Sequence, residues 1–374
     1  MDAVKHIGLS EASLGPEEEE AVLAVLRSGW LTQGEKVATF ERAFARTHAM
    51  EHAVAVNSAT AGLHLSLAAL GIGPGEDVLV PAVTFVATAN AVFYTGAKAL
   101  PVDAAAADNP HMSMEHAASL LTDRTRAVIL MHYGGYAMDM EAWSAFCARH
   151  GLLLLEDAAH APGLKGVGRQ SSAAVYSFFG NKNMTTAEGG MITTRDGALA
   201  ERLRRLRGHA MSAPTLTRAR GHAFSYDIEE LGWNYRLDEL RAAVGLAQLQ
   251  KLDAFNARRA ALARLYRRLM AEALPEAAAP FSGEHASVNH LFTVVLPEGT
   301  ARPDVMRAMR ERGVQTSIHY PPWYRFTWHS DQVGTVSLPH ADAYCARTLT
   351  LPLHPQMTDD DVAYVVQSLS SSLR

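Results

Sequence analysis

Short apolar runs alternate with helical patterns from about residue 50 to residue 210 of the chain. The apolar runs predict five strands, at 52–56, 77–81, 99–103, 126–133 and 152–157. Helical patterns follow three of them, at 59–71, 85–96 and 138–151. Because the runs are apolar throughout rather than alternating, we expect a mainly parallel sheet that helices cover on both faces. Ligands of such sheets bind at the carboxyl ends of the strands, so the segments that follow each strand are candidates for chemistry.

The pattern becomes helical after residue 236, where apolar side chains recur on one face of two consecutive stretches, 237–255 and 256–274. Further on, three segments read in order as strand, helix and strand: 287–296, 303–313 and 314–320. The run AAAAD at 104–108 reads instead as a loop.

Together these patterns predict an α/β protein with two domains. We expect residues 1–250 to form a large three-layer α/β/α domain with a mainly parallel sheet, and residues 251–374 to form a smaller C-terminal α/β domain. The N-terminal segment is expected to pack on the small domain. A length of 374 residues fits this division, because single cores rarely grow beyond about 250–300 residues.

Composition narrows the class of protein. Apolar residues make up 48% and charged residues 20% of the chain, as in average globular proteins, and the formal net charge is −5. Basic and acidic residues are interleaved, which excludes the basic stripe of a nucleic-acid-binding protein. The two cysteines, Cys147 and Cys345, show neither metal-ligand spacing nor a disulfide framework, which favours a reducing compartment. Since the sequence also shows no signal-peptide pattern and no bilayer-length apolar run, we expect a cytoplasmic enzyme without metal, nucleic-acid or membrane partners.

One lysine lies between two apolar runs, in the segment VYSFFGNKNMTTAEGGMITT at 175–194. Lys182 is either a solvated turn residue or a nucleophile on a rigid scaffold. Asp157 ends an apolar strand, where it either caps a following helix or pairs with a cationic ring nitrogen, as an aspartate does in lysine-linked pyridoxal phosphate enzymes. Twenty-five positions separate the two residues, which is enough for a loop and one further strand, so both side chains could meet at one sheet edge.

Other polar and aromatic side chains also follow strands. Ser58 and Thr60 begin a helix, where they are either simple caps or part of an anion site, and the Ser177 hydroxyl could reach the same anion. Phe85 is either a core residue or a ring that stacks on a flat cofactor, and His160 is either a satisfied histidine or a further cofactor contact.

The segment ELGWNYRLDEL at 230–240 precedes a long helical stretch and reads as a capped interface turn. Such a turn could also reach into the site of a neighbouring subunit.

Taken in order, segments along nearly the whole chain resemble the DegT-type (DegT/DnrJ/StrS) nucleotide-sugar aminotransferases, a pyridoxal-phosphate-dependent family of fold type I. The resemblance is carried by LRSGWLTQGEKVATFERAFA, VAVNSATAGLHLSL, VLVPAVTFVATANAV, LLEDAAHA, SFFGNKNMTTAEGGM, LGWNYRLDELRAAVGLAQL, SIHYPP and LTLPLHPQMTDDDV. It implies the large domain of that fold and a homodimer whose subunits share their active sites.

The resemblance also assigns roles to single residues. Lys182 matches the catalytic lysine that forms a Schiff base with the cofactor, and Asp157 matches the catalytic carboxylate on the pyridine nitrogen. The further cofactor contacts that it implies are Ala59, Thr60 and Ser177 at the phosphate, Phe85 and His160 at the ring, and Asn234 from the other subunit. The substrate contacts that it implies are Trp30, Thr32, His319 and Tyr320.

The implied reaction moves an amino group from glutamate to a nucleotide-linked keto-deoxy sugar, in the biosynthesis of cell-surface polysaccharides or secondary metabolites. The form of the lysine loop resembles members that act at C-4, which favours a 4-keto-6-deoxy sugar. A 3-keto sugar or an inosose remains an alternative, as do a sugar dehydratase and a pyridoxal phosphate sensor without turnover. Lys182 speaks against the dehydratase, because that branch carries histidine there.

Three positions depart from the usual pattern of the family. Ala187 stands where glycine is usual, which we expect to be harmless if φ is negative there, and Trp233 replaces the more frequent tyrosine. The segment WYRF at 323–326 stands where a histidine is common, which leaves the sugar specificity open.

Overall fold

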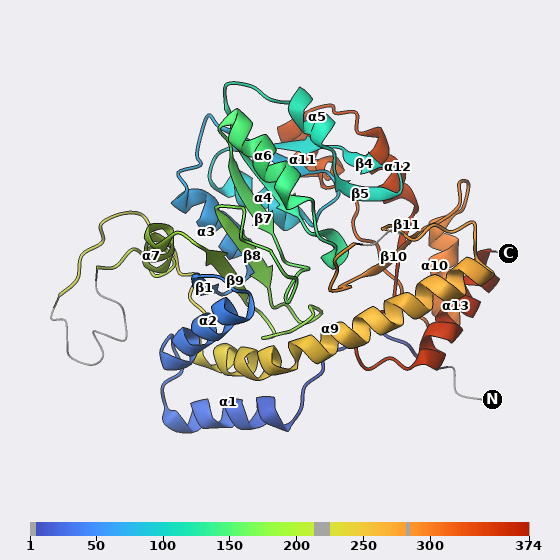
Figure 1. The fold of residues 1–374 in the computed structure, drawn as a ribbon, viewed down its shortest axis with the longest axis horizontal. Coiled ribbons are helices and arrows are strands. Elements are labelled where there is room, and N and C mark those ends of the chain that lie inside the picture. The colour runs from blue at the N-terminus through green and yellow to red at the C-terminus, as the bar shows by residue number, and fades with distance from the viewer. Residues whose placement is uncertain (1–4, 213–224, 282–284, 374) are drawn as a thin grey trace.

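A computed structural model describes residues 5–212, 225–281 and 285–373 and places a seven-stranded sheet at the centre of the larger part of the chain (Figure 1). In the order of the sheet, the strands are β1 (His52–Val56), β9 (Gly190–Thr194), β8 (Ala173–Ser177), β7 (Leu153–Asp157), β6 (Thr125–Met131), β2 (Asp77–Pro81) and β3 (Lys98–Val102). Neighbours from β8 to β3 are parallel, whereas β9 runs antiparallel to both β8 and β1. The predicted mainly parallel sheet is therefore confirmed.

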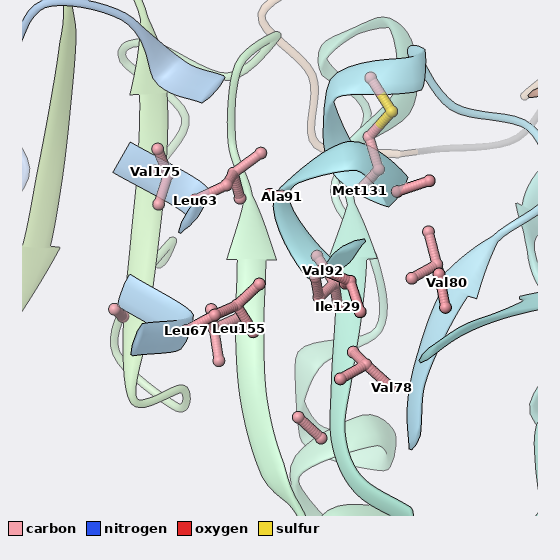
Figure 2. Packing of buried hydrophobic residues seen from close by; sticks show 14 of the residues in the cluster. Leu63, Leu67, Val78, Val80, Ala91, Val92, Ile129, Met131, Leu155 and Val175 are labelled. Atoms are coloured by element: carbon pink, nitrogen blue, oxygen red, sulfur yellow. The ribbon is translucent and has the colours of Figure 1, made fainter. Parts of the chain in front are cut away.

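Helices cover both faces of this sheet. The first face carries α3 (Ala59–Ala69), α4 (Val86–Tyr94) and α7 (Gly197–Leu206), which share one apolar cluster with it. In Figure 2, Leu63 of α3 and Val92 of α4 lie over Ile129, Leu155 and Val175 of three neighbouring strands. Successive side chains of a strand point to opposite faces, so the residues between these belong to the cores of the other face.

The second face carries two further clusters. One is built around α6 (Met140–His150) and contains Val128, Leu130 and Leu154 of the sheet. The other contains Ala174 and Tyr176 of β8 together with apolar residues of α2 (Glu35–Thr47) and α9 (Glu239–Ala273). Three layers result, as the uninterrupted apolar strands predicted.

The remaining elements complete the chain. The N-terminal helix α1 (Pro16–Ser28) packs on α9. The segment after β3 holds the two-stranded ribbon of β4 (Ala104–Ala106) and β5 (Asn109–Met112) and then the helix α5 (Met114–Ser119). The 3-10 turn η1 (Tyr133–Gly135) follows β6. The C-terminal part contains β10 (Phe292–Val295), α10 (Arg302–Glu311), η2 (Trp323–Arg325), α11 (Thr327–Val333), α12 (Pro339–Arg347), β11 (Thr348–Leu351) and α13 (Asp359–Leu373).

A separate apolar core surrounds the antiparallel pair β10 and β11. It includes side chains of α10, α13 and the second half of α9, and Ile7 of the N-terminal segment packs into it. Ile7 also forms backbone hydrogen bonds with this part, donating to Gly313 O and accepting from Gln315 N. The proposed boundary between residues 250 and 251 falls inside α9, which runs without interruption across the lower half of the molecule in Figure 1, above α1. The two-domain division remains a prediction.

The structure corrects four details of the expected elements. The stretches 237–255 and 256–274 form one helix, α9, and the strand expected at 287–296 is limited to β10. The expected strand at 314–320 is reduced to bridges at Val314 and Ser317, because the segment turns toward the cavity described below. The expected loop at 104–108 contains β4, whose pairing with β5 overrides the weak strand preference of alanine.

Within the described part of the chain, no helix combines the length and the hydropathy that a membrane span requires.

Candidate active site

A cavity of about 320 Å³ opens at the carboxyl ends of β7 and β8, where the topology of the sheet predicts a ligand site. Its walls come from the start of α3, the segment between β2 and α4, the segments after β7 and β8, and residues 319–320. Of the twelve residues to which the resemblance assigns a role, nine line it: Ala59, Thr60, Phe85, Asp157, His160, Ser177, Lys182, His319 and Tyr320.

Lys182 lies in a tight turn after β8, in which its backbone N–H donates to Phe179 O at 3.0 Å. Its side chain lines the cavity, so it is not a freely solvated turn lysine. Burial lowers the pKa of the Lys182 amine to about 8, although the negative charge of Asp157 opposes this shift. Near neutral pH the amine can therefore both hold and release a proton.

The turn around Lys182 is held by side chains from distant parts of the chain. The Asn183 amide donates to Asn256 Oδ1 at 2.7 Å and to Val288 O at 2.9 Å, and its own Oδ1 lies 3.0 Å from His290 Nδ1. The Thr185 hydroxyl donates to Phe178 O at 3.2 Å. These bonds fix the backbone on both sides of Lys182.

Ala187 ends this turn with a φ of 66°, in the left-handed region that favours glycine. We expected the alanine to be harmless only with a negative φ, so that condition is not met. The turn requires a positive φ here whichever residue occupies the position, and the alanine side chain strains it.

Asp157 ends β7 and is buried, with its carboxylate bonded on both oxygens. The Thr88 hydroxyl donates to Oδ2 at 2.7 Å and the Ala159 N–H donates to Oδ1 at 3.0 Å. Burial raises the pKa of Asp157, and these two donors together with the charge of Lys182 oppose that rise. The Ala159 bond resembles a cap, but residues 158–172, which directly follow Asp157, contain no helix, so the carboxylate is left to serve the cavity.

The first turn of α3 points at the cavity. The Ser58 hydroxyl caps the helix by accepting from Ala61 N at 3.1 Å. Ala59 and Thr60 are the first two residues of the helix, and N–H groups at these positions have no acceptor within a helix. Ser177 Oγ accepts from Phe179 N at 3.3 Å, which leaves its hydrogen available for donation. Amides, a hydroxyl and the helix dipole together favour an anion at this end.

Gly190 at the start of β9 permits this arrangement. A Cβ atom at Gly190 would lie 2.8 Å from the backbone nitrogen of Ala59 and 2.9 Å from Tyr176 O, which is closer than real Cβ contacts. The absence of a side chain therefore allows the sheet to approach the start of α3.

His160 and Tyr320 form a linked pair on another wall. Gly134 N donates to His160 Nδ1 at 3.1 Å, and His160 Nε2 lies 2.8 Å from the Tyr320 hydroxyl oxygen. Burial holds the pKa of His160 well below 6.5, so the ring is neutral and its hydrogen resides on Nε2. Nε2 then donates to Tyr320 and leaves the tyrosine hydrogen free for the cavity.

Phe85 and His319 flank this pair. The Phe85 ring is 53% exposed and lies 5.6 Å, centroid to centroid, from the Tyr320 ring, so one of its faces is open to the cavity. His319 Nδ1 lies 2.8 Å from Thr350 Oγ1, and burial lowers the pKa of His319 to about 4. A flat group could lie against Phe85 without displacing these contacts.

Three of the residues expected at the site do not line this cavity. Trp30 is partly exposed and donates from Nε1 to Gln33 O at 3.3 Å, and Thr32 is exposed. Asn234 is also exposed, and its carbonyl accepts from the Asn57 amide at 3.3 Å. All three lie near the start of α9, whose Glu239 N donates to Leu31 O. Their expected roles remain predictions.

The cavity also holds residues that the sequence reading missed. Met131, Ala159, Asn181 and Glu188 line it, and Thr88 lies directly behind Asp157. Asn181 Oδ1 is buried without a hydrogen-bond partner among the described residues. Proximity to Lys182 in the sequence could have suggested Asn181, whereas the position of Thr88 depends on how α4 docks on the sheet.

Comparisons with known proteins agree with this geometry. The sequence model of the DegT/DnrJ/EryC1/StrS aminotransferase family matches residues 12–370. The structure is similar to that of Helicobacter pylori PseC, an aminotransferase involved in the biosynthesis of pseudoaminic acid, with a TM-score of 0.92, 28% identity and coverage of 99% of both chains.

Two further solved structures are similar over the whole chain. The sugar aminotransferase CalS13 from Micromonospora echinospora has a TM-score of 0.88 and 27% identity, with coverage of 98% of this chain and 99% of that chain. NtdA from Bacillus subtilis, with bound cofactor PMP, has a TM-score of 0.87 and 26% identity, with coverage of 98% and 86%.

Proposed function

The chain belongs to the DegT/DnrJ/EryC1/StrS aminotransferase family of pyridoxal-phosphate-dependent sugar aminotransferases, and from this membership we propose that it moves the amino group of glutamate to a nucleotide-linked 4-keto-6-deoxy sugar. We propose the cytoplasm as its compartment and a role in polysaccharide or secondary-metabolite sugar biosynthesis. The observation that carries the proposal is the meeting of Lys182, Asp157 and the start of α3 in one cavity.

The donor set of the cavity fits pyridoxal phosphate. The amides of Ala59 and Thr60 and the hydroxyl of Ser177 suit its phosphate, and the Asp157 carboxylate suits a protonated ring nitrogen. The close approach that Gly190 permits brings the phosphate end near the sheet. We propose that these residues hold the group, with Phe85 against its ring.

When bound, pyridoxal phosphate supplies an aldehyde that reacts with amines and a ring that accepts the electrons released at the donor's α-carbon. We propose that Lys182 holds this group covalently through Nζ until the amine of glutamate displaces it. The Lys182 Nζ, once free, would be the group that accepts the proton from the α-carbon of glutamate and later returns it. A pKa of about 8 suits an amine that accepts and returns a proton near neutral pH.

Asp157 and the His160–Tyr320 pair support this transfer in our proposal. The Asp157 carboxylate keeps a proton on the ring nitrogen, because its negative charge faces the cavity beside two fixed donors. His160 is neutral, so it adds no positive charge that would compete with the ring nitrogen for the Asp157 carboxylate. His319 and Tyr320 are proposed to line the sugar side, where the free hydroxyl hydrogen of Tyr320 can donate to a sugar oxygen.

A panel of nucleotide keto sugars tests the proposed acceptor. The purified protein is incubated with glutamate and each sugar, and NMR of the product locates the new nitrogen. Our proposal requires amination at C-4 of a 4-keto-6-deoxy sugar. Nitrogen at C-3, or turnover of an inosose alone, would show that the acceptor differs from the one proposed, while the proposed transamination would still hold. Loss of a sugar hydroxyl without amination would indicate a dehydratase, and binding without any turnover would indicate a sensor.

We further propose a homodimer in which Asn234 reaches the phosphate in the partner's cavity. Asn234 is exposed and does not line the cavity of its own chain, which supports a role across an interface. Trp30 and Thr32 lie near the same end of α9, and we propose that they reach the sugar in the same way.

Hybrid dimers test this arrangement. A Lys182→Ala chain and an Asn234→Ala chain are co-expressed with different tags, and only the mixed dimer is purified. If Asn234 serves the partner, one site of the hybrid carries both defects and the other carries none, so activity returns. If Asn234 serves its own chain, each site keeps one defect and activity stays low.

A further inference from the structure

Thr88 is a buried residue in the first turn of α4 to which the proposed reaction assigns no role. Its hydroxyl lies behind Asp157, donates to Asp157 Oδ2 at 2.7 Å and is inaccessible to solvent. From this contact we infer that Thr88 is a positioning residue that fixes the Asp157 carboxylate in its ionised form for the ring nitrogen of the cofactor. The inference rests on the proposed role of Asp157.

A second threonine gives the Thr88 hydroxyl its direction. Thr84 Oγ1 lies 2.7 Å from Thr88 Oγ1 and 3.0 Å from Met131 Sδ, and both threonines are fully buried. A hydroxyl has one hydrogen, and Thr88 gives its hydrogen to the carboxylate, so Thr88 must accept from Thr84. The thioether of Met131 is a weak acceptor and competes poorly for the Thr84 hydrogen. The chain runs from Thr84 through Thr88 to Asp157, and each bond strengthens the next.

This chain matters because Asp157 is buried. Burial favours the neutral carboxyl group, and a neutral Asp157 could no longer attract a protonated ring nitrogen. Only two donors, the Thr88 hydroxyl and Ala159 N–H, contact the carboxylate among the described residues. Removing the Thr88 hydroxyl leaves the ionised carboxylate with one hydrogen-bond donor instead of two.

The two donors also fix the carboxylate plane. Ala159 N–H holds Oδ1 from the segment after β7, and Thr88 holds Oδ2 from α4. The same turn of α4 begins after Phe85, its N-cap residue, which lines the cavity. One turn of helix therefore sets both the ring-stacking residue and the orientation of the carboxylate.

Thr88→Val tests the inference, because valine keeps the shape of threonine and removes the hydroxyl. A hydrogen bond to a charged group corresponds to about a ten- to hundredfold change in binding. We expect Thr88→Val to weaken pyridoxal phosphate binding by that factor and to shift the pH at which the absorbance of the bound cofactor changes. Thr88→Ser retains the hydroxyl and should restore both properties. Thr95→Val at the other end of α4, where the hydroxyl donates to Val92 O and accepts from Ala97 N, is the matched control and should bind normally.

A double-mutant cycle with Asp157→Asn separates a positioning role from a structural one. If Thr88 acts through Asp157, Thr88→Val should weaken cofactor binding in the natural background and add little in the Asp157→Asn background. An equal loss in both backgrounds would overturn the inference, as would an Asp157-dependent loss that Thr88→Ser does not repair. If Asp157→Asn itself leaves cofactor affinity and the absorbance transition unchanged, the proposed role of Asp157 fails instead.

Discussion

Lys182 should destabilise the cofactor-free protein because it carries a charge into the cavity. Its amine has a pKa of about 8 in the folded chain against an ordinary value of 10.5, so the unfolded chain binds the proton more tightly. At 1.36 kcal/mol per pH unit, this difference costs the folded state up to about 3 kcal/mol at pH 7. The cost falls as pH rises from 8 to 10.5 and drops below about 1 kcal/mol near pH 10.5, where the unfolded chain also loses the proton.

Lys182→Met removes the charge and keeps a side chain of similar length. We expect the cofactor-free variant to be more stable than the natural protein by up to about 3 kcal/mol at pH 7, with solvent in the cavity reducing the gain. Urea unfolding of both cofactor-free proteins between pH 7 and 10.5 measures the difference, in which the titrating groups that do not interact with Lys182 cancel. A difference that is absent at pH 7, or that does not shrink toward pH 10.5, would refute the reasoning.

Two further predictions concern the walls of the site and its support. Gly190→Ala places a Cβ atom 2.8 Å from Ala59 N, so it should cost about 1–3 kcal/mol and weaken pyridoxal phosphate binding about tenfold, measured by equilibrium dialysis. Gly73→Ala, whose Cβ has only Thr95 O within 4 Å, at 3.9 Å, is the control and should bind normally. Arg207→Ala removes the buried partner of Glu41 and a bond to Ala55 O, so urea unfolding should show a loss of about 3–5 kcal/mol. A loss below about 1 kcal/mol would mean that water replaces the guanidinium.

The sheet was predictable because its strands are short, apolar and buried on both faces. Local sequence could not reveal the partners of weaker segments. Ala104–Ala106 became a strand through pairing with β5, and the expected strand at 314–320 was lost where His319 and Tyr320 turn to the cavity. The two helical stretches expected from the pattern also join without a break into the single helix α9.

The site was predictable where chemistry follows strand ends. Lys182 and Asp157 meet because parallel strands present their carboxyl ends at one edge. Thr88 was missed because a threonine in a helical pattern carries no signal until the helix docks against Asp157. The positive φ of Ala187 was also missed, because this backbone angle depends on the fold of the whole turn and not on the residue itself.

Lys182 is the residue that we propose to hold pyridoxal phosphate. Borohydride reduction of the loaded protein, followed by proteolysis and mass spectrometry, measures which lysine carries the cofactor. We predict one reduced cofactor on the peptide that contains Lys182 and none on the Lys182→Ala protein. A cofactor mass on any other lysine, with Lys182 unmodified, would contradict it.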